Sequence, residues 1–252
     1  MAEIILQEGL ASREVNIVRA VAITNDIKVR ISSLENLEQH KVPLITGALP
    51  VGSVEFVKKA MKILHIPCPR NYSYYISRNS SHYCRDIETA RISDIKRYRS
   101  RVFLKPRDIK TFNGFVYNPT GEYDNDHDRE QHAIVSSLGD DTPIYICAPV
   151  KWVSEVRYYI YRWSILGEGR YDDGPDDAPM PDQRVVNYIA MMACPPICAL
   201  DVGVLDTGET AIVEVNDAWA LGFYSGTLSH EDYFMMLWER WQSLLRVNDG
   251  KN

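Results

Sequence analysis

Several common sequence signals are missing from this chain of 252 residues. It contains no run of about 18 apolar residues, so no membrane-spanning helix is predicted. Its first residues lack the basic stretch and apolar core of a secretory signal, and neither an internal repeat nor a low-complexity tract is present. We therefore expect a cytoplasmic protein built from ordinary globular domains.

Paired cysteines and excess positive charge are also missing. The five cysteines form no Cys-x-x-Cys pair, and Cys194 and Cys198 bracket two prolines, which fits neither a zinc knuckle nor a redox motif. Reduced and mostly buried thiols are expected. The formal net charge of −6 argues against a general nucleic-acid binder, because binding to phosphates requires a basic field.

The first part of the chain predicts an α/β layer. The apolar residues 4–6 predict a strand, and a helix is expected over residues 12–24. A second strand at 42–46 leads through a glycine-containing turn at 47–52 into a helix that begins near Ser53. A phosphate could bind at that helix N-terminus, but packing is favoured because the segment lacks the Gly-Lys-Ser/Thr ending of a phosphate loop.

Positive charge is concentrated between residues 91 and 101, after a connector rich in proline and tyrosine. These side chains could form a solvated helix face. Alternatively, one or two of them could point at a triphosphate. The basic residues are Arg91, Lys96, Arg97, Arg99 and Arg101.

Lys105 lies in an otherwise apolar strand that begins near Val102. A lysine in that setting must reach a counter-ion or lose hydration energy, so we expect it to face a ligand. A short loop carrying Lys110 and Gly114 then leads into a strand at 115–117. Two strands joined by such a loop can fold over a nucleotide as a flap.

Two segments in the middle of the chain have alternative interpretations. Residues 124–132 are acidic and contain two histidines, but we expect a solvated loop there rather than a metal site. After an apolar strand at 144–150, the predicted strand 154–166 places Glu155 and Arg157 on one face. An internal ion pair explains these two residues, and so does a fork that holds phosphate. A loop at 167–183 and helices at 181–192 and 229–245 complete the expected elements.

The most informative stretch runs from Cys198 to Asn216 and predicts a hairpin. With a two-residue turn at Thr207-Gly208, Asp201 lies directly opposite Glu214. Like charges in that position are destabilising unless a cation lies between them. Asn216 shares the face of Glu214, and three oxygen ligands suit Mg²⁺. An ordinary polar strand face is the alternative.

Taken together, these motifs resemble the ATP-grasp superfamily. A lysine-proline strand is followed by a flap with lysine and glycine, an apolar strand, a Ser-Glu-x-Arg strand, and Asp with Glu-x-Asn on a hairpin. The resemblance covers about residues 100–225, and residues 52–57 resemble the helix start of the preceding domain. The chain looks like a compact bacterial or phage-type member.

The resemblance implies an α/β (α+β) protein with two domains. An N-terminal α/β (pre-ATP-grasp) domain is expected over residues 1–95. An ATP-grasp fold follows over residues 96–252, with a small lid subdomain at about 100–150 and a larger antiparallel-sheet subdomain.

The resemblance also implies roles for individual residues. Lys105 resembles the lysine that contacts the nucleotide phosphates, and Lys110 with Gly114 resembles the flap that closes over them. A four-residue stretch is similar to the hinge whose backbone pairs with adenine. It consists of Cys147, Ala148, Pro149 and Val150.

Further roles concern phosphate and metal. Arg157, with Glu155 beside it, resembles the arginine that faces phosphate or acyl-phosphate, while Asp201, Glu214 and Asn216 resemble the ligands of the magnesium ions that bridge ATP. Asp217 stands where proline is common, so residues 218–224 are a candidate acceptor pocket, unless they only pack. A second phosphate-binding side chain has four candidates, which are Lys96, Arg97, Arg99 and Arg101.

The implied activity is an ATP- and Mg²⁺-dependent ligase that joins a small-molecule or peptide carboxylate to an amine through an acyl-phosphate. This reaction requires no protein nucleophile, and the chain has no recognisable nucleophile–base motif. The alternatives are an ATP-grasp-type kinase and a non-catalytic nucleotide-binding protein. No membrane partner and no general nucleic-acid partner are expected.

Overall fold

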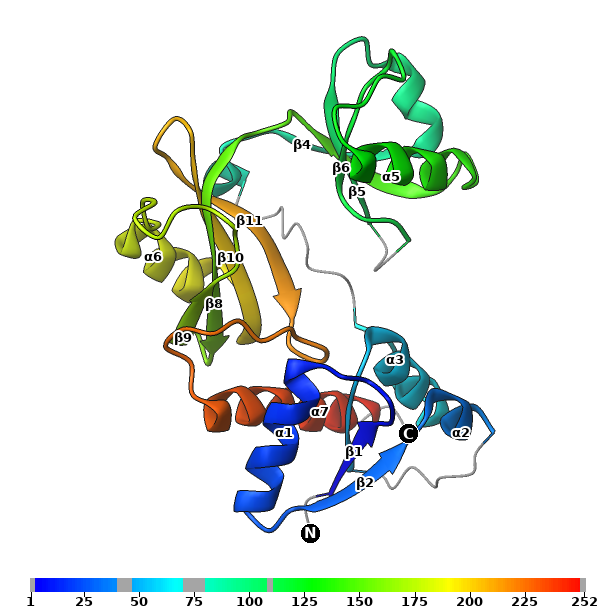
Figure 1. Ribbon diagram of the computed structural model, residues 1–252, viewed down its shortest axis with the longest axis vertical. Coiled ribbons are helices and arrows are strands. Elements are labelled where there is room, and N and C mark those ends of the chain that lie inside the picture. Colours follow the sequence, from blue (N-terminus) through cyan, green and yellow to red (C-terminus); the bar gives the residue numbers. More distant parts are fainter. Residues whose placement is uncertain (1–2, 40–46, 70–79, 108–110, 250–252) are drawn as a thin grey trace.

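A computed structural model describes residues 3–39, 47–69, 80–107 and 111–249. In these residues three sheets follow one another through the molecule, with the central sheet between the other two (Figure 1). The mixed α/β architecture predicted from the sequence is confirmed. Within the described residues, no helix has both the length and the apolar character needed to cross a membrane.

The N-terminal sheet is parallel and has the strand order β2-β1-β3. Ser12 and Ser53 cap its two longer helices as predicted, because each hydroxyl accepts a hydrogen bond from a backbone N–H of the first turn, both at 3.2 Å. The elements are β1 (Glu3–Gln7), α1 (Arg13–Thr24), β2 (Lys28–Ser32), α2 (Leu34–Glu38), β3 (Leu49–Val51) and α3 (Val54–Ile63).

Strand β3 corrects one prediction. It lies inside the segment 47–52 that was expected to be a turn, because Leu49 and Val51 are buried while the strand pairs with β1. Gly47 and Gly52 therefore bracket a strand. The strand predicted at 42–46 lies outside the described residues.

The outer sheet has the order β4-β7-β5-β6, and all its pairs are antiparallel. Its elements are the 3₁₀ helix η1 (Ser80–Tyr83), β4 (Ile87–Arg91), the 3₁₀ helix η2 (Ile92–Arg97), β5 (Val102–Pro106), β6 (Phe115–Tyr117), α5 (Asp126–Ser136) and β7 (Pro143–Cys147). Strand β4 precedes the domain boundary predicted at residue 95, although it pairs with β7 of this sheet.

Helix α5 shows that the loop predicted at 124–132 was wrong. Asn125 caps the helix by accepting a hydrogen bond of 2.7 Å from the N–H of Asp128. Acidic side chains in a first turn favour helix formation, so the charges that suggested a solvated loop stabilise a helix start. Gln131 and Val135 are buried.

The central sheet is antiparallel with the order β11-β10-β8-β9. Residues 162 and 163 turn the chain with positive φ angles of 51° and 62°, which ends the strand predicted at 154–166 and starts β9 in the predicted loop at 167–183. The elements are β8 (Trp152–Tyr161), β9 (Ser164–Arg170), α6 (Gln183–Ala193), β10 (Ile197–Leu205), β11 (Thr210–Asp217) and α7 (His230–Asp249).

The two faces of the central sheet have different neighbours. Val156, Tyr158 and Ile160 pack with the buried face of α6 in one core cluster. Tyr159 belongs to the other large cluster, which contains α7 and the N-terminal helices. Helices α1 and α7 lie beside each other below the sheet, although they come from opposite ends of the chain (Figure 1). Because side chains alternate along a strand, the polar residues of β8, β10 and β11 face away from α6.

Candidate functional site

Asp201 lies directly opposite Glu214, as predicted, although the hairpin differs from the prediction. The turn has three residues, closed by a hydrogen bond of 2.9 Å from Leu205 N to Glu209 O, with Gly208 at φ +87°. This turn shifts the pairing by one residue, so that Val202 pairs with Ile212. A bulge beyond that pair then restores the predicted register at Asp201.

Asn216 joins the two carboxylates into one cluster. Its Nδ2 lies 3.0 Å from Asp201 Oδ2 and 2.8 Å from Glu214 Oε1. Rotation of the amide would turn its Oδ1 towards the same point, giving three hard oxygen donors of the kind that Mg²⁺ prefers. The described residues contain no group of three His, Cys, Asp or Glu side chains that could hold a metal, because the third donor here is an amide.

Arg157 neutralises Asp201 from the neighbouring strand. Its Nε and Nη2 donate to the two carboxylate oxygens at 2.7 and 2.6 Å, and both side chains are buried. Burial lowers the pKa of Arg157, but the charge of Asp201 opposes that effect and leaves the pKa above its ordinary value. Of the two predicted explanations, an internal ion pair is therefore present. Nη1 additionally donates to Gly222 O at 3.3 Å.

Lys105 connects the outer sheet to the central sheet. Its Nζ forms an ion pair with Glu214 across the space between β5 and β11. Burial lowers the pKa of Lys105 to about 8, although the nearby Asp201 raises it. The strand lysine thus faces the same cluster as Arg157 and Asn216.

Arg85 also belongs to this region, and the sequence did not single it out. The half-buried side chain donates to the carbonyl oxygens of Tyr83 and Ile212 at 2.9 and 3.2 Å, and its guanidinium lies 5.3 Å from the ring centre of Trp152. It is close enough to lower the pKa of Lys105. A lone arginine ahead of the short strand β4 carries no local sequence signal.

The basic residues that were predicted as phosphate candidates are all exposed. Arg97 pairs with Asp94, and Arg101 pairs with Asp124 at 2.6 Å. Arg99 donates to a backbone oxygen, that of Lys96, at 3.0 Å. These contacts are local, so the structure does not bring the four residues into the carboxylate cluster.

The predicted hinge, residues 147–150, connects β7 of the outer sheet to β8 of the central sheet. Cys147 is buried, which raises the pKa of its thiol, whereas Ala148 and Pro149 are exposed and Val150 is partly exposed. In the predicted flap, Gly114 is required because a Cβ there would lie 2.6 Å from the ring of Phe103. Lys110 lies outside the described residues.

Glu155 lies on the same face of β8 as Arg157. Burial raises its pKa, an effect that Asp201 increases and that the hydrogen bond of 2.8 Å from Tyr171 partly offsets. The ring of Tyr171 stacks on Tyr224 at 4.9 Å, and the guanidinium of Arg157 lies 4.9 Å from the Tyr224 ring centre. Tyr171 escaped prediction because it falls in a segment expected to be a loop.

An outer sheet that presents a lysine to a carboxylate–amide cluster on a central antiparallel sheet defines the ATP-grasp fold. Residues 50–244 match a family model described as an ATP-grasp domain, the third family of its clade. The chain therefore belongs to this family of ATP-grasp proteins. No curated protein matches it.

Solved structures of ATP-grasp ligases share this fold. D-alanine–D-alanine ligase from Bacillus anthracis is 16% identical with a TM-score of 0.54, and the match covers 100% of this chain and 99% of that one. The same enzyme complexed with ATP gives 15%, 0.57, 98% and 99%. A RimK domain ATP-grasp protein from Sphaerobacter thermophilus gives 12%, 0.50, 95% and 99%. At these identities the likeness concerns the fold alone.

Proposed function

We propose that the protein is an ATP- and Mg²⁺-dependent ligase that joins a carboxylate to an amine. The observation that carries this proposal is the convergence of Lys105 with Asp201, Glu214 and Asn216 where the outer and central sheets meet. Cationic and anionic groups in one part-buried site are suited to a metal-bound triphosphate, whose charge must be neutralised from both sides.

In this proposal the outer sheet is the lid, and the lid begins at Ile87 because β4 belongs to the same sheet. Lys105 and Arg85 face the phosphates, with the flap around Gly114 above them. The backbone of residues 147–150 contacts the adenine. Arg157 orients the reacting phosphate or acyl-phosphate next to Glu155, because its Nη1 and Nη2 each keep an N–H beyond the bonds to Asp201 and Gly222.

Asp201, Glu214 and Asn216 are the proposed holders of Mg²⁺, which would withdraw charge from the phosphates and orient them for in-line transfer. Lys105 now donates to Glu214, so it must move from that carboxylate to phosphate oxygens when the nucleotide binds. Such an exchange keeps the lysine paired in both states, which lowers the cost of its burial.

The reaction has two balanced steps. A substrate carboxylate oxygen bonds to the γ-phosphorus while the bond from that phosphorus to the β,γ-bridging oxygen breaks and ADP leaves. The amine nitrogen then bonds to the acyl carbon, phosphate leaves with its oxygen, and the amine gives up a proton. The protein supplies position and charge, and none of its side chains becomes covalently attached.

The test measures ADP and phosphate release by the full chain with ATP and Mg²⁺, against paired panels of carboxylic acids and amines. Release that requires both an acid and an amine is expected. Glu214→Gln should abolish it, whereas Glu209→Gln is the matched control because Glu209 is an exposed carboxylate of the same hairpin. A phosphorylated hydroxyl product would show a kinase, and ATP binding without any turnover would show a nucleotide-binding protein; either result contradicts the proposal.

A further inference from the structure

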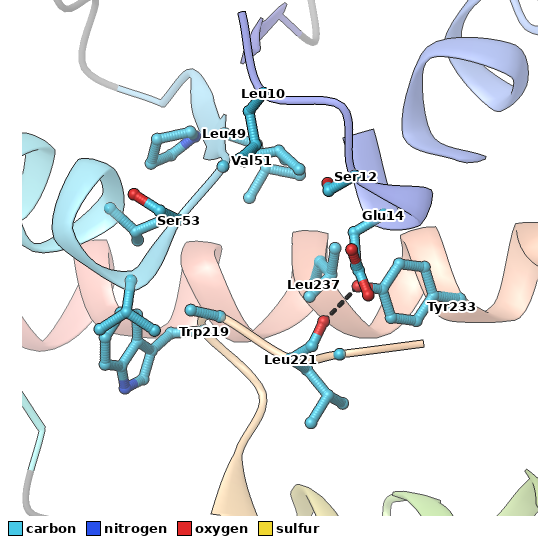
Figure 2. A pocket seen from close by; sticks show the side chains of 16 residues that line it. Leu10, Ser12, Glu14, Leu49, Val51, Ser53, Trp219, Leu221, Tyr233 and Leu237 are labelled. Carbon is cyan, nitrogen blue, oxygen red and sulfur yellow. Dashed lines mark hydrogen bonds between the residues drawn. The ribbon is translucent and has the colours of Figure 1, made fainter. Parts of the chain in front are cut away.

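A cavity of about 240 Å³ lies between the N-terminal domain and the segment that follows β11 (Figure 2). Its volume is roughly eight times the ~30 Å³ that one water occupies in the liquid, so a compound of amino-acid size fits. The walls come from the β1–α1 and β3–α3 connections, from α7, and from residues 219–222. They are mainly apolar and include Leu10, Leu49, Val51, Val54, Trp219 and Leu221.

The polar groups of this cavity are few, and most are already used. Ser12 and Ser53 cap helices, and the Tyr233 hydroxyl donates to the carbonyl oxygen of Leu221. Glu14 is the one charged residue among those that line the cavity in the described chain. Its Oε1 accepts a hydrogen bond of 2.9 Å from Phe223 N, an uncharged partner that leaves the negative charge uncompensated.

Gly222 connects this cavity to the carboxylate cluster. Its carbonyl oxygen accepts hydrogen bonds from Arg157 Nη1 at 3.3 Å and from the Tyr159 hydroxyl at 3.1 Å. A Cβ at Gly222 would lie 3.4 Å from Arg157 Nη1 and 3.8 Å from Glu14 Oε1. The glycine therefore separates Glu14 from Arg157 by little more than its own backbone, which leaves room for a small molecule to approach both.

We infer that this cavity binds the carboxylate substrate, and that this substrate is an amino acid with an apolar side chain. The inference rests on the ligase activity proposed above. The ammonium group faces Glu14, the carboxylate extends past Gly222 towards Arg157, and the side chain fills the apolar part of the cavity. An apolar wall selects for buried hydrocarbon, and a single uncompensated carboxylate selects for a cation.

The first test measures binding by isothermal titration calorimetry with the full chain, Mg²⁺ and a non-hydrolysable ATP analogue. Leucine should bind at least about tenfold more tightly than glycine and than 4-methylpentanoate, which lacks the amine. Glu14→Gln keeps an acceptor for Phe223 N and removes the charge, so leucine binding should weaken about tenfold while nucleotide binding stays unchanged. Glu55→Gln is the matched control, because Glu55 is an exposed acid in the first turn of α3.

A second pair of variants tests the size and the position of the cavity. Val54→Phe should weaken leucine binding about tenfold and leave alanine and glycine within about twofold, since it reduces the space for the side chain. Gly222→Ala adds a methyl at ordinary contact distance, so it should fold normally and weaken every amino acid by obstructing the junction. Thermal unfolding and nucleotide titration show whether each variant is folded.

The outcomes separate this inference from the proposed ligase activity. Amino-acid binding that responds to these variants without any ADP release supports the cavity and overturns the ligase. ADP release whose KM for every acid is the same in Glu14→Gln, Val54→Phe and the parent overturns the cavity and leaves the ligase intact. Equal binding of leucine, glycine and 4-methylpentanoate also overturns the inference.

Discussion

Arg157 and Asp201 face each other across β8 and β10 and are joined by two parallel N–H···O bonds of 2.7 and 2.6 Å. The aspartate is 1% exposed and the arginine 8%. A buried carboxylate with this geometry is neutralised by one specific partner, so the position of Asp201 beside Glu214 depends on Arg157.

Arg157→Ala should therefore lower the free energy of unfolding by about 3–5 kcal/mol, because it leaves a buried charge without its partner. Addition of Mg²⁺ should raise the melting temperature of this variant more than that of the parent, since a cation can then neutralise Asp201. Urea unfolding measures the first effect. Arg184→Ala is the control, because Arg184 forms an exposed pair with Asp182, and such pairs contribute about 1 kcal/mol or less. Equal losses in the two variants would contradict this account of the buried pair.

Local sequence signals were sufficient for much of the fold. Ser12 and Ser53 each precede an amphipathic segment, and capping depends only on neighbouring residues, so both helix starts were predictable. Strand β3 was not, because its three residues form a strand only by pairing with β1, about 45 positions earlier in the chain. Asn125 with acidic residues after it is a helix signal that the charge of the segment obscured.

The candidate site was predictable to the extent that one hairpin contains it. Asp201, Glu214 and Asn216 were placed together by strand periodicity, even though the predicted turn was one residue too short and a bulge compensated for the error. Arg85 and Tyr171 could not be found in this way. They approach the cluster from other elements, and such proximity is a property of tertiary packing.

Lys105 should give ATP affinity an alkaline limb. Burial lowers its pKa to about 8 from 10.5, so in the free protein the side chain loses its positive charge as pH rises through about 8. The apparent association constant for ATP, measured by calorimetry between about pH 6.5 and 9.5, should fall over that range. Lys105→Arg should remove the limb, because arginine stays protonated. The same limb in Lys105→Arg would assign it to another group.

Arg85→Gln should weaken ATP binding about tenfold, which corresponds to about 1.4 kcal/mol, because it removes a cation close to Lys105. It should also move the alkaline limb to higher pH, since Arg85 contributes to the lowered pKa of Lys105. Arg101→Gln is the control, as Arg101 is exposed and paired with Asp124. A pH profile that does not shift in Arg85→Gln would show that the two cations do not interact.

Arg240 holds the end of β11 in place through Asp217, the residue after Asn216. Its Nε and Nη2 donate to the two Asp217 oxygens at 2.7 and 2.6 Å. Arg240→Gln should raise the Mg²⁺ concentration needed for half-maximal ADP release, because Asn216 loses a fixed backbone position. A double-mutant cycle with Asp217→Asn should give a coupling free energy of unfolding of about 1 kcal/mol or more. The exposed Arg246→Gln should change neither quantity, and an unaltered Mg²⁺ requirement in Arg240→Gln would contradict the proposed role.

The central claim is that Asp201, Glu214 and Asn216 hold the Mg²⁺ that accompanies ATP. Calorimetric titration of ATP with and without Mg²⁺, on the parent chain, Glu214→Gln and Glu209→Gln, tests it most directly. Mg²⁺ should tighten ATP binding at least about tenfold in the parent and in Glu209→Gln, a gain of about 1.4 kcal/mol. In Glu214→Gln this gain should disappear while binding without Mg²⁺ persists. An undiminished Mg²⁺ effect in Glu214→Gln would contradict the claim.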